Sequence, residues 1–138
     1  MIETKIFTRT FPAQLSEMDN FLAYTEEIME GCDCPFKVIT QITLALEELF
    51  VNVASHAYPE GNGTLDYTIM ADDGKMTFIM EDSGVPFDPL AKKDPDITLS
   101  VEERDIGGLG IYMVKNIMSE INYSYTDGKN VLTLIKNL

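Results

Sequence analysis

The spacing of apolar and polar residues predicts a strand and two helices in the first half of the chain. Residues 2–9 alternate with a period of two and include several β-branched side chains, which is typical of a strand. After Pro12, apolar residues recur at helical spacing as far as Gly31, and glycine suits the left-handed end of a helix. A second helix is expected from Pro35, a residue that fits a first helical turn, to about Tyr58.

A hairpin is expected after the second helix. Residues 65–70 and 76–80 both alternate, and the Asp-Asp-Gly sequence at 72–74 between them is typical of a tight turn. Residues 83–107 follow neither period and are rich in Asp, Glu, Pro and Gly. A loop of this length in a small domain is usually functional or mobile, and a disordered insertion is the alternative.

The last part of the chain predicts a third helix and a closing hairpin. Helical spacing begins at Gly108, and two further strands, 121–126 and 130–135, flank the turn sequence Asp127-Gly128. The order β-α-α-β-β-loop-α-β-β predicts an α+β fold, a two-layer α/β sandwich in which helices cover one face of a sheet. We expect a single domain over residues 1–138.

Composition narrows the possible partners. The net charge of −13 disfavours non-specific binding to nucleic acid, which depends on neutralising phosphates, and favours a basic protein partner. A small anionic ligand would need backbone amides, a helix N-terminus or a divalent cation. No uninterrupted apolar run approaches the roughly 20 residues that cross a bilayer, and residues 1–5 are no signal peptide. We therefore expect a cytoplasmic protein without membrane partners.

A polar stripe runs along the second predicted helix. Glu48, Asn52 and His56 are spaced at i, i+4 and i+8 and would share one face. The opposite face is apolar: Ile42, Ala45, Leu46, Leu49, Val53 and Ala57. This arrangement indicates either a partly buried cleft or the solvated edge of an amphipathic helix.

Two glycine-containing turns add candidate chemistry. Asp82 and Gly84 follow a predicted strand, where a carboxylate could accept a hydrogen bond from an exocyclic amino group and glycine would let a planar base approach. An ordinary turn after a strand is the alternative. Gly107, Gly108 and Gly110 lie at the start of the third helix, although glycine costs roughly 1 kcal/mol in a helix interior.

These glycines predict an anion site. Unobstructed amides at a helix N-terminus suit a phosphate group, and a close-packed helix entry is the alternative. The chain contains neither a G-x-x-x-x-G-K-[ST] sequence nor a G-x-G-x-x-G sequence after a strand. P-loop and Rossmann sites are therefore excluded.

Together the three segments resemble a known superfamily. Glu48-x-x-x-Asn52 resembles the N box, Asp82-x-Gly84 the G1 box and residues 107–110 the G2 box of the gyrase, Hsp90, histidine-kinase and MutL ATPases. The continuations of the first and third boxes, 52–58 and 107–114, resemble the anti-sigma factor serine/threonine kinases of bacterial partner-switching systems. The resemblance extends over about residues 5–136.

The resemblance implies a Bergerat (histidine-kinase-like ATPase) fold that binds ATP and Mg²⁺, with residues 83–107 as a lid. Asn52 would ligate Mg²⁺, Asp82 would bind the adenine amino group, and Gly84 would pack beside the ring. Phosphate would be bound at the third helix by Gly107, Gly108, Leu109 and Gly110. The sequence does not choose among Lys92, Lys93 and Arg104 as additional phosphate ligands.

It also implies a reaction. Glu48 would be the general base of a protein serine/threonine kinase, and Glu47, about 100° around the helix, is the alternative. The implied substrate is an anti-anti-sigma protein with a STAS domain, the implied second partner is an RNA polymerase sigma factor, and the implied assembly is a homodimer.

Alternatives remain within the resemblance. A non-catalytic nucleotide-binding or partner-binding module of the same fold is the second function. A histidine-kinase catalytic domain would need a phosphoacceptor histidine on a dimerisation helix, and a gyrase or MutL motor would need a transducer domain. The G-x-G-T sequence that often supports the adenine-binding aspartate is missing, and Asn130 or Thr133 would have to replace its threonine.

Overall fold

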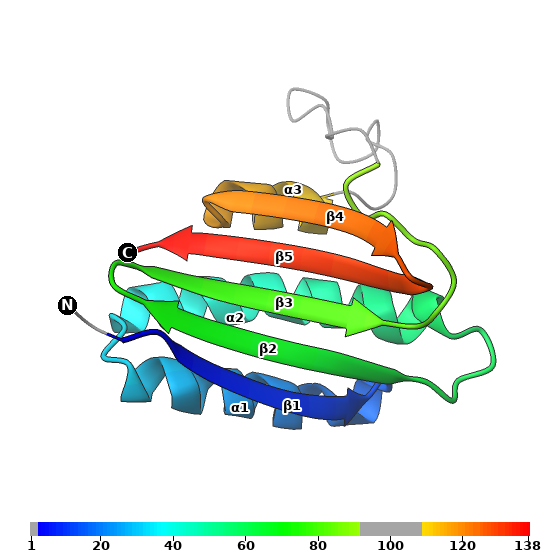
Figure 1. Cartoon of the computed structure of the whole chain (residues 1–138), viewed down its shortest axis with the longest axis horizontal. Coiled ribbons are helices and arrows are strands. Elements are labelled where there is room, and N and C mark those ends of the chain that lie inside the picture. Colours follow the sequence, from blue (N-terminus) through cyan, green and yellow to red (C-terminus); the bar gives the residue numbers. More distant parts are fainter. Residues whose placement is uncertain (1–2, 92–108) are drawn as a thin grey trace.

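A single antiparallel sheet forms one layer of the protein. The computed structural model describes residues 3–91 and 109–138, and within them five strands pair in the order β1-β2-β3-β5-β4 (Figure 1). The strands are β1 (Lys5–Pro12), β2 (Thr64–Asp72), β3 (Lys75–Asp82), β4 (Glu120–Thr126) and β5 (Lys129–Asn137). Both predicted hairpins are confirmed, because β2 pairs with β3 and β4 with β5. The chain crosses over between β3 and β4, so that β5 lies beside β3.

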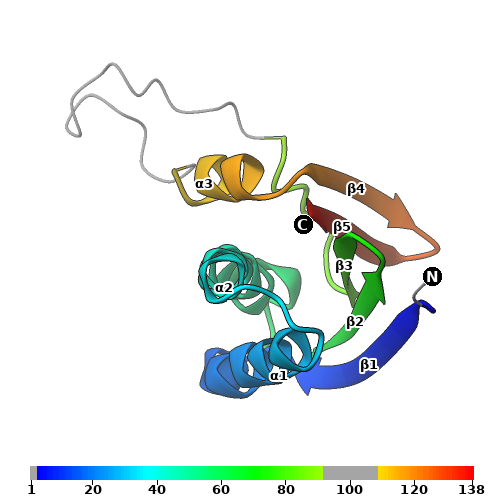
Figure 2. The same ribbon diagram turned by 90° about the vertical axis from the view of Figure 1, so that its left-hand side faces the viewer.

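Helices cover one face of this sheet, as Figure 2 shows. They are α1 (Met18–Gly31), α2 (Phe36–Asn52) and α3 (Leu109–Ile117), with a 3₁₀ turn η1 (Leu15–Glu17) before α1 and a π-helical turn η2 (Val53–Ala57) after α2. α2 lies between the other two and contacts both. The predicted α+β two-layer sandwich and the predicted order of elements are confirmed.

Several helix and strand boundaries differ from the predicted ones. The first strand was predicted at 2–9 and lies at Lys5–Pro12, where the proline is tolerated because β1 is an edge strand. Pro35 is the N-terminal flanking residue of α2, with extended φ/ψ of −60° and 143°, and the helix begins at the next residue. The last predicted turn of this helix is a π-helical turn, which no apolar period predicted.

Aromatic residues dominate the core beneath β1 and β2. Phe21 of α1 packs between Phe50 of α2 and Tyr67 of β2, with ring centroids 4.7 and 4.5 Å away, respectively. Phe11 of β1 meets the Phe21 ring edge-on at 5.6 Å. These four rings are at most 1% exposed, so they join both helices to the sheet through a single apolar cluster.

The helix formed by α2 and its π-helical extension, Phe36–Ala57, is 22 residues long and apolar enough to cross a membrane by length and composition. It is the only such segment within the described residues. Its apolar face packs against the sheet, with Ile42, Ala45 and Leu46 completely buried. We interpret it as the central core helix of the sandwich.

One polar pair lies inside the aromatic cluster. The hydroxyl groups of Thr25 and Tyr67 are 2.7 Å apart, and the Thr25 hydroxyl also donates to the Phe21 carbonyl at 3.1 Å. Burial of the ring raises the pKa of Tyr67, and this effect outweighs the hydrogen bond with Thr25, which lowers it. The phenol therefore remains neutral in the native protein over the range in which a solvated tyrosine ionises.

The raised pKa of Tyr67 predicts a loss of stability in alkaline solution. Below pH ~10 both states retain the phenolic proton, whereas above it only the unfolded chain releases it, so the free energy of unfolding should fall by about 1.4 kcal/mol per pH unit for this group. Urea titrations between pH 9 and 11 should show a shallower decline for Tyr67→Phe. At pH 7 the same variant should lose only about 1 kcal/mol, the value of one hydrogen bond. Equal alkaline slopes would contradict this account.

Candidate nucleotide-binding site

The candidate site lies where the end of β3 meets the end of α2. Asp82 is the last residue of β3 and is 7% exposed. Its Oδ1 accepts hydrogen bonds from the Gly84 N–H at 3.0 Å and from Asn130 Nδ2 at 2.8 Å. Its Oδ2 accepts none from the described part of the chain, and no buried polar atom there lacks a partner, so this oxygen faces accessible space. A carboxylate held by one oxygen can offer the other to a donor.

Gly84 fastens the turn after β3 to the end of the helix. A Cβ atom at Gly84 would overlap the carbonyl group of Ala57, the last residue of the π-helical turn. The next amide, that of Val85, donates to the same Ala57 carbonyl at 2.8 Å. The close approach therefore requires glycine, and the turn cannot move independently of the helix.

Tyr58 makes a second attachment at this point. Its hydroxyl donates to the Thr64 carbonyl at 2.7 Å and accepts from the Ser83 N–H at 2.8 Å. The ring lies directly against Gly63, where a Cβ atom would overlap it. Tyr58 thereby joins the end of the helix, the start of β2 and the turn after β3.

Asn130 of β5 supports the Asp82 carboxylate. It is 5% exposed and lies directly opposite Asp82 in the β3–β5 pairing. Thr133 is paired with Ile79 and lies on the other face of the sheet from Leu132 and Leu134, which belong to the core. Of the two alternatives, only Asn130 is hydrogen-bonded to Asp82 in the described structure.

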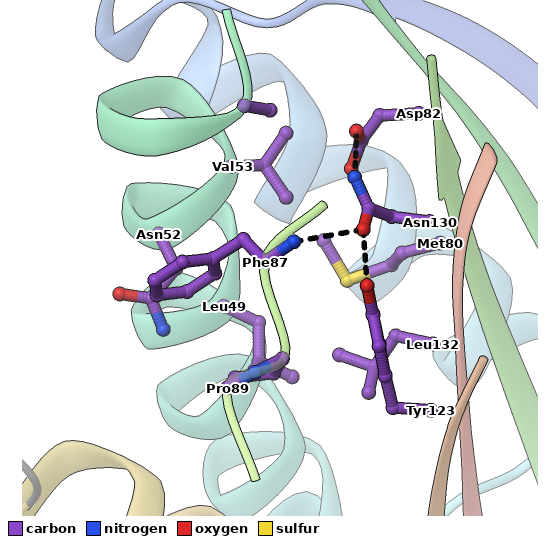
Figure 3. A pocket seen from close by; sticks show the side chains of 11 residues that line it. Leu49, Asn52, Val53, Met80, Asp82, Phe87, Pro89, Tyr123, Asn130 and Leu132 are labelled. Atoms are coloured by element: carbon purple, nitrogen blue, oxygen red, sulfur yellow. Dashed lines mark hydrogen bonds between the residues drawn. The ribbon is translucent and has the colours of Figure 1, made fainter. Parts of the chain in front are cut away.

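A small pocket lies beside Asp82, between α2 and the sheet (Figure 3). Its free volume is about 30 Å³, the share of one water molecule in the liquid. The walls are mostly apolar and include Leu49, Val53, Met80, Phe87, Pro89, Tyr123 and Leu132, whereas Asn52, Asp82 and Asn130 contribute polar groups. A planar apolar group with one polar edge would match this lining.

Phe87 closes one side of the pocket. Its ring stacks on that of His56, with centroids 4.8 Å apart and an angle of 18° between the planes. Figure 3 shows the Phe87 side chain directed toward Asn52 on α2. The three residues of the predicted polar stripe are thus Asn52 at the pocket, His56 at its rim behind Phe87, and Glu48 farther along α2. No sequence signal marks Phe87, because it belongs to a loop without periodicity.

Glu48 lies against the start of α3. A Cβ atom at Gly110 would overlap the carboxylate of Glu48, so the absence of a side chain at Gly110 allows this contact. Glu48 is partly buried, whereas the neighbouring Glu47 is exposed. The negative charge of Glu48 therefore lies near the N-terminus of a helix, where the partial positive charge of the helix dipole stabilises it.

Other predicted residues fall outside the described structure. Gly107 and Gly108 lie there, as do Lys92, Lys93 and Arg104 of the predicted lid, and the side chain of Leu109 is not described either. The loop 83–107 is described only as far as residue 91. Among residues 3–91 and 109–138, no cluster of three His, Cys, Asp or Glu side chains could hold a metal ion. A cation at this site would need oxygen ligands from a bound small molecule in addition to the side chain of Asn52.

Curated relatives of the chain are named protein kinases. It is 28% identical to the serine/threonine-protein kinase BtrW of Bordetella bronchiseptica over 94 residues, which are 67% of this chain and 66% of that protein. It is 30% identical to the serine-protein kinase RsbW of Bacillus anthracis over 98 residues, 68% of this chain and 61% of the relative. The chain thus spans less than two thirds of the length of either relative.

A solved structure shares the fold. The RsbU and RsbW domains of Rv1364c from Mycobacterium tuberculosis align with 97% of this chain and 32% of that one, with a TM-score of 0.66 and 18% sequence identity. The family model of the histidine kinase-like ATPase domain matches residues 11–136, which is nearly the whole chain. The fold and the family implied by the three boxes are confirmed: the chain belongs to the histidine kinase-like ATPase domain family.

Proposed function

We propose that the protein is an Mg-ATP-dependent serine/threonine kinase of the anti-sigma factor type, located in the cytoplasm. The observation that carries this proposal is the buried Asp82, which lines the pocket and has one oxygen held by protein donors and one without a donor from the described residues. Adenine presents an exocyclic amino group and flat apolar faces, which match this oxygen and the apolar walls. The kinase names of the relatives support the reaction class.

The residues present suit a nucleotide with its cation. Asn52 offers a side-chain oxygen, a ligand type that Mg²⁺ accepts, and it would hold the ion together with phosphate and water oxygens. Gly107, Gly108, Leu109 and Gly110 would bind the phosphates. The free volume of about 30 Å³ is too small for a purine, so binding would require Phe87 and Pro89 to move outward.

Glu48 is the residue we propose as general base. Bound Mg-ATP would supply the phosphoryl group. Glu48 would orient the hydroxyl of an incoming serine and accept its proton, while the α3 N-terminus beside it stabilises negative charge. The exposed Glu47 has no comparable contact with α3.

We propose two partners. The substrate is a STAS-domain anti-anti-sigma protein, and the second partner is an RNA polymerase sigma factor, which the kinase sequesters. The kinase would act as a homodimer. The net charge of −13 suits a basic surface on the sigma factor. A non-catalytic nucleotide-binding or partner-binding module of the same fold is the second candidate function. Retained regulation by a variant that cannot bind nucleotide would distinguish the two.

Nucleotide binding should depend on Asp82. Replacing its carboxylate in Asp82→Asn puts an amide opposite the adenine amino group and should weaken ATP binding at least about tenfold, the value of a hydrogen bond to a charged group. Calorimetric titration with and without Mg²⁺ measures this. The matched control is Glu81→Gln, which removes the neighbouring carboxylate on the other face of β3 and should bind like the wild type. If ATP affinity does not depend on Mg²⁺ and is the same in the wild type and in Asp82→Asn, the assignment of the site is wrong.

Phosphotransfer should depend on Glu48. Glu48→Gln retains the shape of the side chain but cannot accept a proton, so transfer to the STAS protein should slow by about 10²- to 10⁴-fold. Radiolabelled Mg-ATP and a purified STAS-domain protein from the same organism provide the assay, and ATP affinity should change by less than about threefold. Glu47→Gln is the control and should be active. Wild-type protein that binds ATP without forming phosphoserine would favour the non-catalytic module.

Two glycine substitutions should separate folding from activity. In Gly84→Ala the new methyl group meets the backbone of Ala57, which should lower stability by about 1–3 kcal/mol. In Gly110→Ala it meets only the flexible end of Glu48, so the thermal midpoint should be at least that of the wild type while phosphotransfer falls. Thermal denaturation and the phosphorylation assay test both variants. Full activity in Gly110→Ala would show that the position of Glu48 is unimportant.

A further inference from the structure

Asn130 makes the full set of hydrogen bonds that its side chain allows. Its Nδ2 donates to Asp82 Oδ1 at 2.8 Å and to the Val85 carbonyl at 2.9 Å. Its Oδ1 accepts from the Phe87 N–H at 3.1 Å and from the Tyr123 hydroxyl. Two donors and two acceptor positions are thus all used in a side chain that is 5% exposed. These four contacts fix the amide in a single orientation, because turning it over would exchange donors and acceptors.

This orientation leaves one carboxylate oxygen of Asp82 without a donor from Asn130 or Gly84. Oδ1 receives the Asn130 amide and the Gly84 N–H, and both of these groups can only donate. A rotation of the carboxylate would bring the other oxygen to the same donors and again leave one oxygen free. The pocket is therefore lined at this point by an acceptor with no competing donor from Asp82 or Asn130.

An acceptor in this position discriminates between purines. Adenine carries an amino group at position 6, which donates, whereas hypoxanthine and guanine carry an oxygen there, which accepts. The 6-oxo bases would place two acceptors face to face in a site from which most water is excluded. Discrimination lasts only while the Asp82 carboxylate is kept from shifting away from this position.

The same amide also positions the wall of the pocket. Asn130 Oδ1 accepts from the backbone of Phe87, and Nδ2 donates to the backbone of Val85, two residues earlier. The turn that supplies the Phe87 ring is therefore attached to the residue that orients Asp82. A movement of the Phe87 wall would therefore also displace the Asp82 carboxylate, because Asn130 is bonded to both.

We propose that Asn130 is the positioning residue that makes the site selective for 6-amino purines, by holding the Asp82 carboxylate and the Phe87 backbone in one fixed arrangement. This inference rests on the proposed role of Asp82 as the adenine acceptor. The polar atoms of Asn130 are all hydrogen-bonded within the protein. Asn130 therefore acts through Asp82 and through the turn at residues 85–87.

The test uses a pair of variants that differ only in a hydrogen-bond donor. Threonine and valine have nearly the same shape, and neither can bond to both Val85 and Phe87 as asparagine does. Only the threonine hydroxyl in Asn130→Thr can donate to Asp82, whereas Asn130→Val cannot. Affinities for ATP and for ITP, its 6-oxo analogue, are measured by calorimetry for the wild type and both variants, and thermal midpoints are recorded alongside.

The wild type should bind ATP at least about tenfold more tightly than ITP. Asn130→Thr should retain most of this ratio, and Asn130→Val should reduce it to less than about threefold, although both lose similar stability. Should Asn130→Val fail to fold, Asn130→Ala, which removes the donor and adds no charge, should show the same loss of selectivity. Equal ratios in the wild type and in a folded Asn130→Val or Asn130→Ala variant would overturn the inference.

The two proposals fail in different ways. Wild-type protein that binds ATP and ITP equally, or neither, would contradict the adenine role of Asp82 itself. A selective wild type whose selectivity survives in Asn130→Val would contradict only the role of Asn130. A purely structural Asn130 would lower the thermal midpoints of the threonine and valine variants without separating their ATP-to-ITP ratios.

Discussion

The contact between Gly84 and the carbonyl of Ala57 is the constraint on which the candidate site depends. It joins the two layers of the sandwich at the point where both α2 and β3 end, and no side chain fits between them. The Val85 amide closes the contact with a hydrogen bond to the same carbonyl. The distance between Asp82 on the sheet and Asn52 on the helix is therefore fixed by backbone, which is the most rigid support that a pocket can have.

The aromatic core provides the second support. Phe21, Phe50 and Tyr67 fix α1 and α2 to the sheet, and α2 in turn presents Glu48 and Asn52 on its polar side. α2 contacts both neighbouring helices, and its Glu48 carboxylate lies beside Gly110 at the start of α3. The charge of Glu48 is placed by this packing, since the glycine at position 110 lets α3 approach the carboxylate.

The π-helical turn connects these supports. A π-helical turn inserts extra backbone at the end of a helix, and such turns are frequent at functional sites. Here it brings the Ala57 carbonyl to Gly84 and Val85, and it is followed at once by Tyr58, which attaches the start of β2. His56 remains on the pocket side and stacks on Phe87. The end of the helix thus contacts both the turn after Asp82, through Ala57, and the Phe87 wall of the pocket, through His56.

The order of elements, both hairpins and the fold class could be predicted from the sequence, because these follow from local periodicity and turn chemistry. The turn at Asp127-Gly128 is an example: both residues have positive φ, as the sequence of a two-residue hairpin predicts. The sequence also predicted Glu48, Asn52, Asp82 and Gly84 as site residues, and of these Asn52 and Asp82 line the same pocket.

Only the tertiary structure decided which residue supports Asp82, since Asn130 and Asp82 are 48 positions apart and meet through the register of β3 with β5. It alone placed Phe87 in the pocket and turned the end of α2 into a π-helical turn. Local patterns record which face a residue occupies. Contacts between distant segments depend on register and packing, which no local period encodes.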